Sequence, residues 1–285
     1  MAQHPENQAA WLTASKATPL EVGPAPYTPP GPGQLVVPVP RRRHPPSHPL
    51  PTIFGEDVSG TVIAIGEGVT RFRVGDRVLT MAGLIPSNNT PEGAFQLLHR
   101  PLIVAGLGLF GKDYLGLDLP TVPARPADGS RVVIIAGGAS SVGGTAVQLA
   151  AAAGYEIVST SSPKNFDLVK SLGAAHVVDY NSPTVGDELL AVRGRQLFIA
   201  RAEGKHSVEE GGEVEVKFIL VSPEVIGAET PLRPIFEEYL PRALVERQFV
   251  PRPKPEVVGT GLDKIQDALE VLRKGVSAKK IIMQL

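Results

Sequence analysis

The pattern of apolar and polar residues is clearest in the middle of the chain. Val132–Ala136 is a continuous apolar, largely β-branched run, which predicts a parallel strand buried on both faces. Gly137 and Gly138 follow directly, and small residues over Ser141–Ala153 predict a helix that ends at Gly154. A second apolar run and a short polar loop come next. This order predicts the front half of a dinucleotide-binding βαβ unit, in which a helix N-terminus faces a pyrophosphate.

The glycine-rich turn carries an incomplete form of the fingerprint G-x-G-x-x-G. Gly138 and Gly143 occupy its outer positions, and Ser140 stands in place of the central glycine. We expect Gly138 to make the tight turn and Gly143 to let the helix approach the strand closely. The hydroxyls of Ser140 and Ser141 can bond phosphate oxygens, and Val142 completes the candidate cofactor-binding turn. The alternative is a packing turn without a ligand, since many strand-to-helix turns contain glycine.

The loop after the second strand indicates which cofactor is bound. Proteins that bind NAD usually have Asp or Glu about 20 residues beyond the last glycine, where the carboxylate bonds the ribose 2′-OH. Ser162 lies at that distance, and Ser159–Asn165 (STSSPKN) contains no acid. Its hydroxyls, the amide of Asn165 and the cation of Lys164 suit a 2′-phosphate, so NADPH is favoured over NADH. Ser162 can equally N-cap the next helix, with Pro163 at its first position, and both interpretations can hold together.

The two ends of the chain show different patterns. The prolines, 28 in all, are concentrated in the N-terminal half, which predicts loop-rich β structure there. Within it, Phe54–Val78 contains two strand-like runs separated by Gly-Glu-Gly and closed by a Val-Gly-Asp turn. Near the C-terminus, Leu262–Lys274 has an apolar stripe at helical spacing and ends before Gly275. The last residues, KKIIMQL, predict a strand.

Composition limits the possible partners and the location. A net charge of −1 over 285 residues gives no field that attracts nucleic acid or an anionic membrane surface. No apolar run is long enough to span a bilayer, and the polar start MAQHPENQAAWL does not resemble a signal peptide. The absence of cysteine excludes disulfides and thiolate metal sites. We therefore expect a cytoplasmic protein without a nucleic-acid or membrane partner.

Metal binding is not expected either. His44 and His48 lie four residues apart, but Pro45, Pro46 and Pro49 around them preclude a helix that would bring both to one face. Two solvated loop histidines are the favoured interpretation.

Several segments resemble a known family. The segment GEDVSGTVIAIGEGVTRFRVGDRV, from residue 55 on, is similar to the GroES-like domain of the medium-chain dehydrogenase/reductase superfamily. SSVGGTAVQLA, STSSPKN, LGAAHVVDY, LFGKDYLGLDLP and GVSAKKIIMQL look like the superfamily's fungal branch of NADPH-dependent, trans-acting enoyl reductases, which serve polyketide synthases. The resemblance implies an α/β fold, with a Rossmann-type doubly wound parallel sheet plus a GroES-like β-rich domain. Residues 1–107 would form the GroES-like catalytic and substrate domain, 108–250 a shortened NADPH-binding Rossmann domain, and 251–285 a C-terminal helix and strand that return to the catalytic domain.

The resemblance also implies individual roles. Tyr180, at the end of LGAAHVVDY, would contact the cofactor, and Val276 and Ser277 would touch its nicotinamide end. Glu56 occupies the position of a histidine that binds catalytic zinc in related alcohol dehydrogenases, so hydride transfer without metal is implied. Glu56 and Asp57 make a poor acid/base pair because adjacent strand residues point to opposite faces. No catalytic residue is assigned.

The chain departs from the branch in places. Val37–Pro51, rich in proline, replaces an expected strand and turn of the active-site cleft, and the charged Arg193–Lys217 replaces part of the expected nucleotide domain. The chain thus resembles a shortened member, by divergence or by mis-assigned exons. Three functions remain open: an enoyl reductase that reduces an α,β-unsaturated acyl thioester for a polyketide synthase in secondary metabolism, a quinone or alkenal reductase acting on free small molecules, and an inactive NADPH-binding remnant.

Overall fold

The computed structural model divides into two compact units. Unit 1 comprises Met1–His99 and Pro255–Leu285, and unit 2 comprises Arg100–Lys254. The unit boundaries at 99 and 254 lie eight and four residues from the domain boundaries expected at 107 and 250. The structure describes residues 7–15, 17–32, 34–36, 57–81, 99–127, 129–191, 198–201, 215–219 and 230–284. Val37–Pro51, with His44 and His48, and Glu56 lie outside the described residues.

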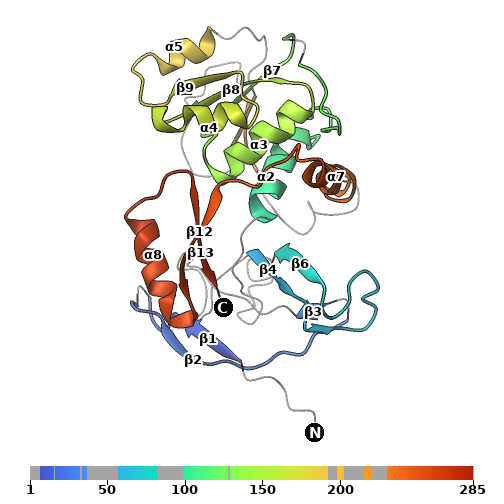
Figure 1. Ribbon diagram of the computed structural model, residues 1–285, viewed down its shortest axis with the longest axis vertical. Coiled ribbons are helices and arrows are strands. Elements are labelled where there is room, and N and C mark those ends of the chain that lie inside the picture. The colour runs from blue at the N-terminus through green and yellow to red at the C-terminus, as the bar shows by residue number, and fades with distance from the viewer. Residues whose placement is uncertain are drawn as a thin grey trace. The chain divides into compact units, whose positions relative to one another are not determined.

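Unit 2 contains the predicted βαβ unit (Figure 1). Strands β7 (Val132–Ile135), β8 (Glu156–Ser161) and β9 (His176–Asp179) form a parallel sheet in the order β7-β8-β9. Helix α3 (Ser141–Ala152) packs on β7 and β8, and α4 (Phe166–Ser171) packs on β8 and β9. The order of these strands is the 3-2-1 half of a doubly wound sheet.

A second parallel pair lies in the segment that the sequence presented as charged and weakly patterned. Strand β10 (Phe198–Arg201) pairs with β11 (Glu215–Phe218), with Phe198 opposite Glu215. In the part of the chain that the structure describes, this pair is a separate sheet from β7-β8-β9. Arg193–Lys217 therefore includes most of two strands, which its charge pattern did not predict.

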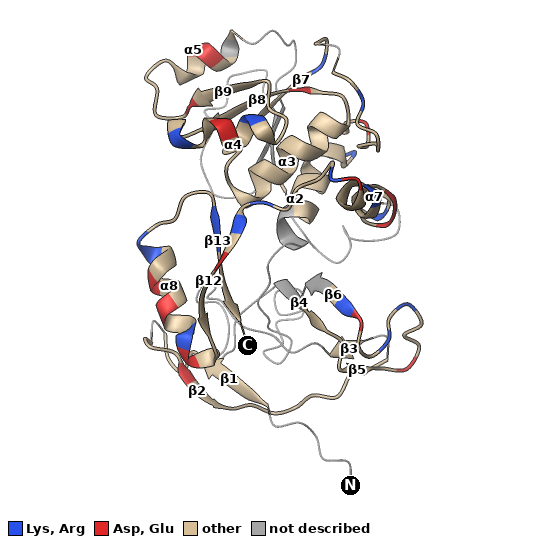
Figure 2. Ribbon diagram, in the orientation of Figure 1, with Lys and Arg blue, Asp and Glu red and all other residues tan. Residues whose placement is uncertain are grey.

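The helices of unit 2 surround a core of small and aliphatic side chains. Helix α3 carries no charged residue (Figure 2), and its Val147, Leu149 and Ala150 are fully buried. Small side chains let a helix approach a sheet closely, which is why this sequence buries a whole helix face. The remaining helical segments are α2 (His99–Phe110), the 3-10 turn η2 (Pro163–Asn165), α5 (Val185–Leu190), α6 (Leu232–Pro234), the π-helical η3 (Ile235–Tyr239) and α7 (Leu240–Val245).

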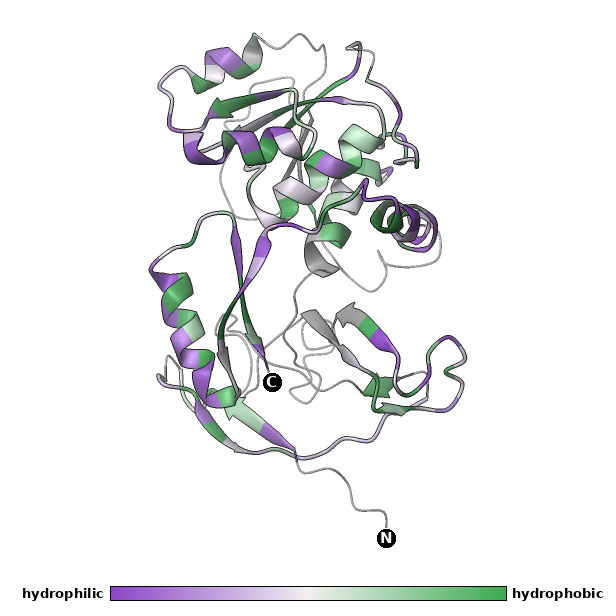
Figure 3. Ribbon diagram, viewed as in Figure 1, coloured by the Kyte–Doolittle hydropathy of each residue, from purple (hydrophilic) through white to green (hydrophobic). Residues whose placement is uncertain are grey.

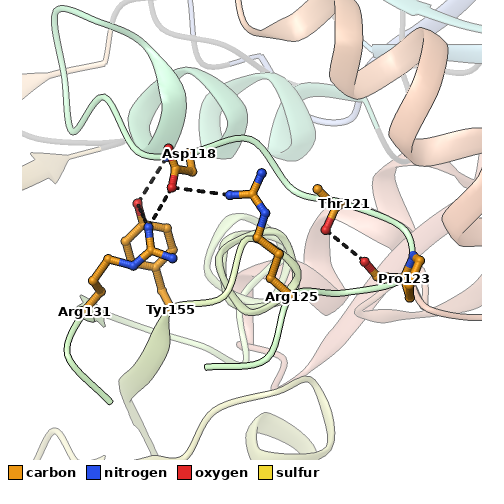
Figure 4. A network of polar contacts seen from close by, with 6 residues as sticks. All are labelled: Asp118, Thr121, Pro123, Arg125, Arg131 and Tyr155. Carbon is orange, nitrogen blue, oxygen red and sulfur yellow. Dashed lines mark hydrogen bonds and ion pairs between the residues drawn. The ribbon is translucent and has the colours of Figure 1, made fainter. Parts of the chain in front are cut away.

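A polar cluster ties a loop to the amino ends of the sheet (Figure 4). Asp118 forms ion pairs with Arg131 at 2.6 Å and Arg125 at 3.3 Å. Arg131 precedes β7, and its guanidinium lies 4.4 Å from the ring centroid of Tyr155, which precedes β8. Tyr155 Oη also accepts from the Asp118 N–H at 3.1 Å. This cluster lies at the amino ends of the strands, and the glycine turn lies at their carboxyl ends.

The N-terminal part of unit 1 contains short antiparallel pairs. Its sheets pair β1 (Gln8–Trp11) with β2 (Glu21–Pro24), β3 (Leu35–Val36) with β5 (Ala64–Ile65), and β4 (Asp57–Thr61) with β6 (Arg77–Met81). The expectation of two strands over Phe54–Val78 was incomplete. The first run divides after Thr61 into β4 and β5, because its two halves have different partners: β4 pairs with β6, and β5 pairs with β3.

The C-terminal part of unit 1 pairs β12 (Lys254–Thr260) with β13 (Lys279–Gln284) and places α8 (Ile265–Arg273) between them in sequence. The predicted helix over Leu262–Lys274 begins with a 3-10 turn, η4 (Leu262–Lys264), and ends before Gly275, whose φ is +86°. Apolar and charged residues alternate along α8 (Figure 3), consistent with one face packing on β13. Across the described helices, none has the length and apolarity that a membrane crossing needs.

Candidate cofactor site

The glycine-rich turn connects β7 to α3 and is closed by its own backbone. Gly137 has φ +70°, a conformation that favours glycine, and its carbonyl accepts from the Ser140 N–H at 2.8 Å. Ser140 is the N-cap of α3, and its Oγ accepts from the Gly143 N–H at 3.0 Å. A Cβ on Gly143 would lie 2.2 Å from the Gly137 carbonyl oxygen. Position 143 thus requires glycine because the helix starts directly over the turn.

The expected roles of the glycines need one correction. Gly138 was expected to make the tight turn, but the positive φ belongs to Gly137. Gly138 instead allows close packing. A Cβ there would lie 2.4 Å from Ser159 Oγ on β8 and 2.6 Å from Val169 Cγ1 on α4. The sequence could not distinguish the two glycines, since which of them bends depends on contacts with β8 and α4.

The first turn of α3 offers free backbone donors. Among the hydrogen bonds of the described residues, none uses the N–H of Ser141 or Val142. Both residues are half-buried. The first N–H groups of a helix lack intrahelical partners, and the helix dipole favours an anion beside them. The geometry of this turn therefore fits a diphosphate group. A nicotinamide dinucleotide contains such a group, so the residues present fit this cofactor.

The acid-free loop begins where β8 ends. Ser162 holds the N-cap position of η2, with Pro163 at its first position, but its hydroxyl bonds no backbone N–H. Instead Ser162 Oγ accepts from Asn165 Nδ2 at 3.0 Å. Lys164 is exposed, and no acid pairs with it within the described residues. The ammonium of Lys164 is therefore available to an anionic ligand.

The other hydroxyls of this segment face the protein. Ser159, Thr160 and Ser161 are between 0% and 7% exposed. Ser159 Oγ donates to the Ile135 carbonyl at 2.6 Å, and Thr160 Oγ1 accepts from the Gly137 N–H at 3.1 Å. Of the hydroxyls in this segment that the sequence suggested as 2′-phosphate ligands, only that of Ser162 is therefore left as a candidate. Ser159 and Thr160 are contacts to the turn that sequence reasoning missed; three successive hydroxyl residues in a buried strand were the available signal.

Tyr180 lies at the same edge of the sheet. It follows β9 directly, its side chain is 54% exposed, and its N–H donates to the Ser161 carbonyl at 3.4 Å. The Gly138 N–H in turn donates to the Thr160 carbonyl at 3.0 Å. The end of β8 therefore joins the glycine turn on one side and Tyr180 on the other, so these predicted ligands are brought together.

The remaining expected ligands lie in unit 1. Val276 and Ser277 follow α8 and precede β13, and Val276 is 38% exposed. Their contact with the nicotinamide end of a cofactor stays a prediction. In the described part of the chain, no three His, Asp or Glu side chains gather in a group that could hold a metal ion.

Comparison with known proteins identifies the family. Residues 36–117 match the model of the alcohol dehydrogenase GroES-like domain. The chain is 36% identical to Dehydrogenase pigH of Monascus ruber over 372 aligned positions, which cover 99% of this chain and all of that protein. The chain belongs to the medium-chain dehydrogenase/reductase superfamily. It is also 30% identical to Trans-enoyl reductase himH of Aspergillus japonicus, over 98% of this chain and 97% of that protein. These relatives place this member of the superfamily in its fungal trans-acting enoyl reductase branch.

The fold comparison agrees with the fold of the superfamily. An alcohol dehydrogenase superfamily protein from Novosphingobium aromaticivorans matches with a TM-score of 0.71, at 21% identity over 96% of this chain and 98% of that protein. This likeness shows the α/β fold of the superfamily, with its GroES-like domain and its Rossmann-type sheet.

The alignment with the Monascus ruber protein also shows that this member is short. It runs over 372 positions, whereas the chain has 285 residues. At least 87 positions, the difference between the two lengths, are therefore gaps in this chain. The expectation of a shortened member is confirmed by this difference in length.

Proposed function

We propose that the protein is an NADPH-dependent enoyl reductase that reduces an α,β-unsaturated acyl thioester for a polyketide synthase in secondary metabolism. The assignment of a nicotinamide cofactor is supported by the groups at the carboxyl edge of the β7-β8-β9 sheet. Within the described residues, the N–H groups of Ser141 and Val142 are free at this edge, and Lys164, which is exposed and has no acidic partner among them, follows in an acid-free loop. A cytoplasmic location, as expected from the sequence, is part of this proposal.

The preference for NADPH rests on charge. An NAD-binding loop would place a carboxylate on the ribose diol, and a carboxylate would repel a 2′-phosphate. Residues 159–165 hold no carboxylate. The ammonium of Lys164 and the hydroxyl of Ser162 suit a phosphate, and a charge-assisted contact of this kind is worth about 1.5–3 kcal/mol.

The bound cofactor would supply a hydride to the β-carbon of the enoyl thioester, and a proton taken up at the α-carbon completes the saturated product. The residues of unit 2 would hold the cofactor. The N–H groups of Ser141 and Val142 would donate to its diphosphate, Lys164 and Ser162 would contact its 2′-phosphate, and Tyr180 would flank it. Negative charge that develops on the thioester oxygen would be met by hydrogen-bond donors.

The acyl-thioester substrate is supported by the relatives. One relative that matches this chain almost from end to end bears the name trans-enoyl reductase. The gap of at least 87 positions favours a second candidate, a protein that binds NADPH without turning over a substrate.

The cofactor preference is tested by replacing Lys164. Lys164→Ala should weaken NADPH binding about 10- to 150-fold, the range that 1.5–3 kcal/mol implies, and leave NADH binding nearly unchanged. Lys170→Ala is the matched control, because Lys170 is an exposed lysine in the last turn of α4. Titration of the wild type and both variants by cofactor fluorescence measures the effect. Equal losses for NADPH and NADH in Lys164→Ala would contradict the NADPH assignment.

The substrate class is tested with a panel of acceptors. We expect NADPH oxidation with enoyl thioesters carried on CoA or on a carrier protein, and none with quinones or free alkenals. Turnover of quinones or alkenals alone would replace the enoyl reductase assignment by that of a small-molecule reductase. Binding of NADPH without oxidation by any acceptor would support the second candidate.

A further inference from the structure

The carboxyl-terminal half of β8 is unusually polar for a buried parallel strand. Ile157 and Val158 are followed by Ser159, Thr160 and Ser161, and all five are at most 7% exposed. Central strands of parallel sheets are ordinarily apolar, and a buried hydroxyl is unfavourable unless it forms a hydrogen bond. The buried hydroxyl of Thr160 should therefore form a hydrogen bond.

Thr160 bonds the glycine turn at two successive residues. Its side-chain Oγ1 accepts from the Gly137 N–H at 3.1 Å, and its carbonyl accepts from the Gly138 N–H at 3.0 Å. The second bond is a backbone contact that any residue could make. The first depends on a hydroxyl at position 160, and it holds Gly137, the residue with φ +70°.

Gly137 in turn determines where α3 starts. Its carbonyl accepts from the Ser140 N–H, and Ser140 caps the helix through Gly143. Gly143 packs so closely on the Gly137 carbonyl that no Cβ fits between them. A shift of Gly137 would therefore displace the first turn of α3, which carries the free N–H groups of Ser141 and Val142.

We propose that Thr160 is a positioning residue for the cofactor, which acts by fixing the Gly137 N–H and hence the diphosphate-binding donors of α3. This inference rests on the proposed function of the turn. Because the diphosphate is common to NADPH and NADH, loss of the hydroxyl should weaken both cofactors equally. Replacing Lys164 should have a different effect, because it should weaken the binding of NADPH alone.

The test compares Thr160→Val, which keeps the shape but removes the acceptor, with Thr160→Ser, which keeps the hydroxyl. Thr121→Val is the matched control, because the Thr121 hydroxyl donates to the Pro123 carbonyl at 2.9 Å (Figure 4), in the loop that precedes β7. Binding of NADPH, NADH and adenosine 2′-monophosphate is titrated for each variant. The last ligand has a 2′-phosphate but no diphosphate.

We expect Thr160→Val to weaken NADPH and NADH about tenfold each, while its affinity for adenosine 2′-monophosphate stays within twofold of the wild type. Thr160→Ser and Thr121→Val should bind all three ligands like the wild type. Unchanged NADPH binding by Thr160→Val overturns the proposal. The proposal is also overturned if the affinity of Thr160→Val for adenosine 2′-monophosphate falls as much as its affinity for NADPH, because that result would mean general damage to the fold. Failure of the wild type to bind either dinucleotide overturns the proposed function as well.

Discussion

Gly143→Ala is the substitution for which the structure gives the sharpest expectation. The added Cβ would lie 2.2 Å from the Gly137 carbonyl oxygen, whereas real Cβ contacts essentially never fall below 3.0 Å. The two groups must therefore separate by at least 0.8 Å, the difference between these distances. The backbone fixes the position of the Cβ, and the oxygen that it meets is itself a backbone atom, so no side-chain rotation can relieve the clash. Overpacking of this kind costs about 1–3 kcal/mol, and the gain in helix propensity from Gly to Ala, about 1 kcal/mol, offsets part of it.

We expect Gly143→Ala to lower the free energy of unfolding by up to about 2 kcal/mol, the overpacking cost less the propensity gain. The affinity for NADPH should fall at least tenfold, because a displacement near 1 Å moves the donors of α3 off the diphosphate. Urea denaturation followed by circular dichroism measures stability, and fluorescence titration measures binding. Gly186→Ala in α5 is the control, since a Cβ there meets nothing within 4 Å. It should gain up to about 1 kcal/mol and bind normally. Wild-type affinity of Gly143→Ala for NADPH would show that the start of α3 over the turn does not position the cofactor.

Other expectations concern the rest of unit 2. Burial raises the pKa of Tyr239 from 10.0 to about 12, and among the described residues its hydroxyl has no hydrogen-bond partner, so the fold holds the neutral phenol. The unfolding free energy should fall as pH rises from about 10 through 12, by roughly 2–3 kcal/mol, and Tyr239→Phe should remove that fall; identical pH profiles of variant and wild type would exclude it. Asp118→Asn should cost less than about 1 kcal/mol in urea denaturation, because both of its ion pairs are substantially exposed, and a loss above about 2 kcal/mol would contradict this. Gln148→Leu should cost about 1–2 kcal/mol, since the Gln148 amide accepts from the Val250 N–H at 2.7 Å and donates to its carbonyl at 3.1 Å; a thermal melt like the wild type's would argue against this clamp.

The βαβ unit could be predicted because each of its parts has a local signal. A β-branched run predicts β7, and small residues after an N-cap serine predict α3. Gly154 adopts the positive φ that is expected after a helix. The family could be predicted because its motifs span both units. Both predictions depend on residues close together in sequence.

The contacts that shape the site depend on residues far apart, so the sequence could not settle them. Gly137 bends and Gly138 packs because Ser159 and Val169 occupy the space beside Gly138. Thr160 faces the turn, and its hydroxyl looked equally available to a ligand. The division of the first run in Phe54–Val78 likewise follows from which partner each half pairs with.

The proposed activity of this chain is the transfer of hydride from NADPH to an enoyl thioester. The most direct test uses NADPH that carries deuterium at the transferable position of its nicotinamide ring, with an enoyl thioester and the purified protein. We expect a saturated thioester with deuterium at its β-carbon, detected by mass spectrometry. Bound NADPH with no deuterated acyl product would contradict it and would leave a protein that binds the cofactor without using it.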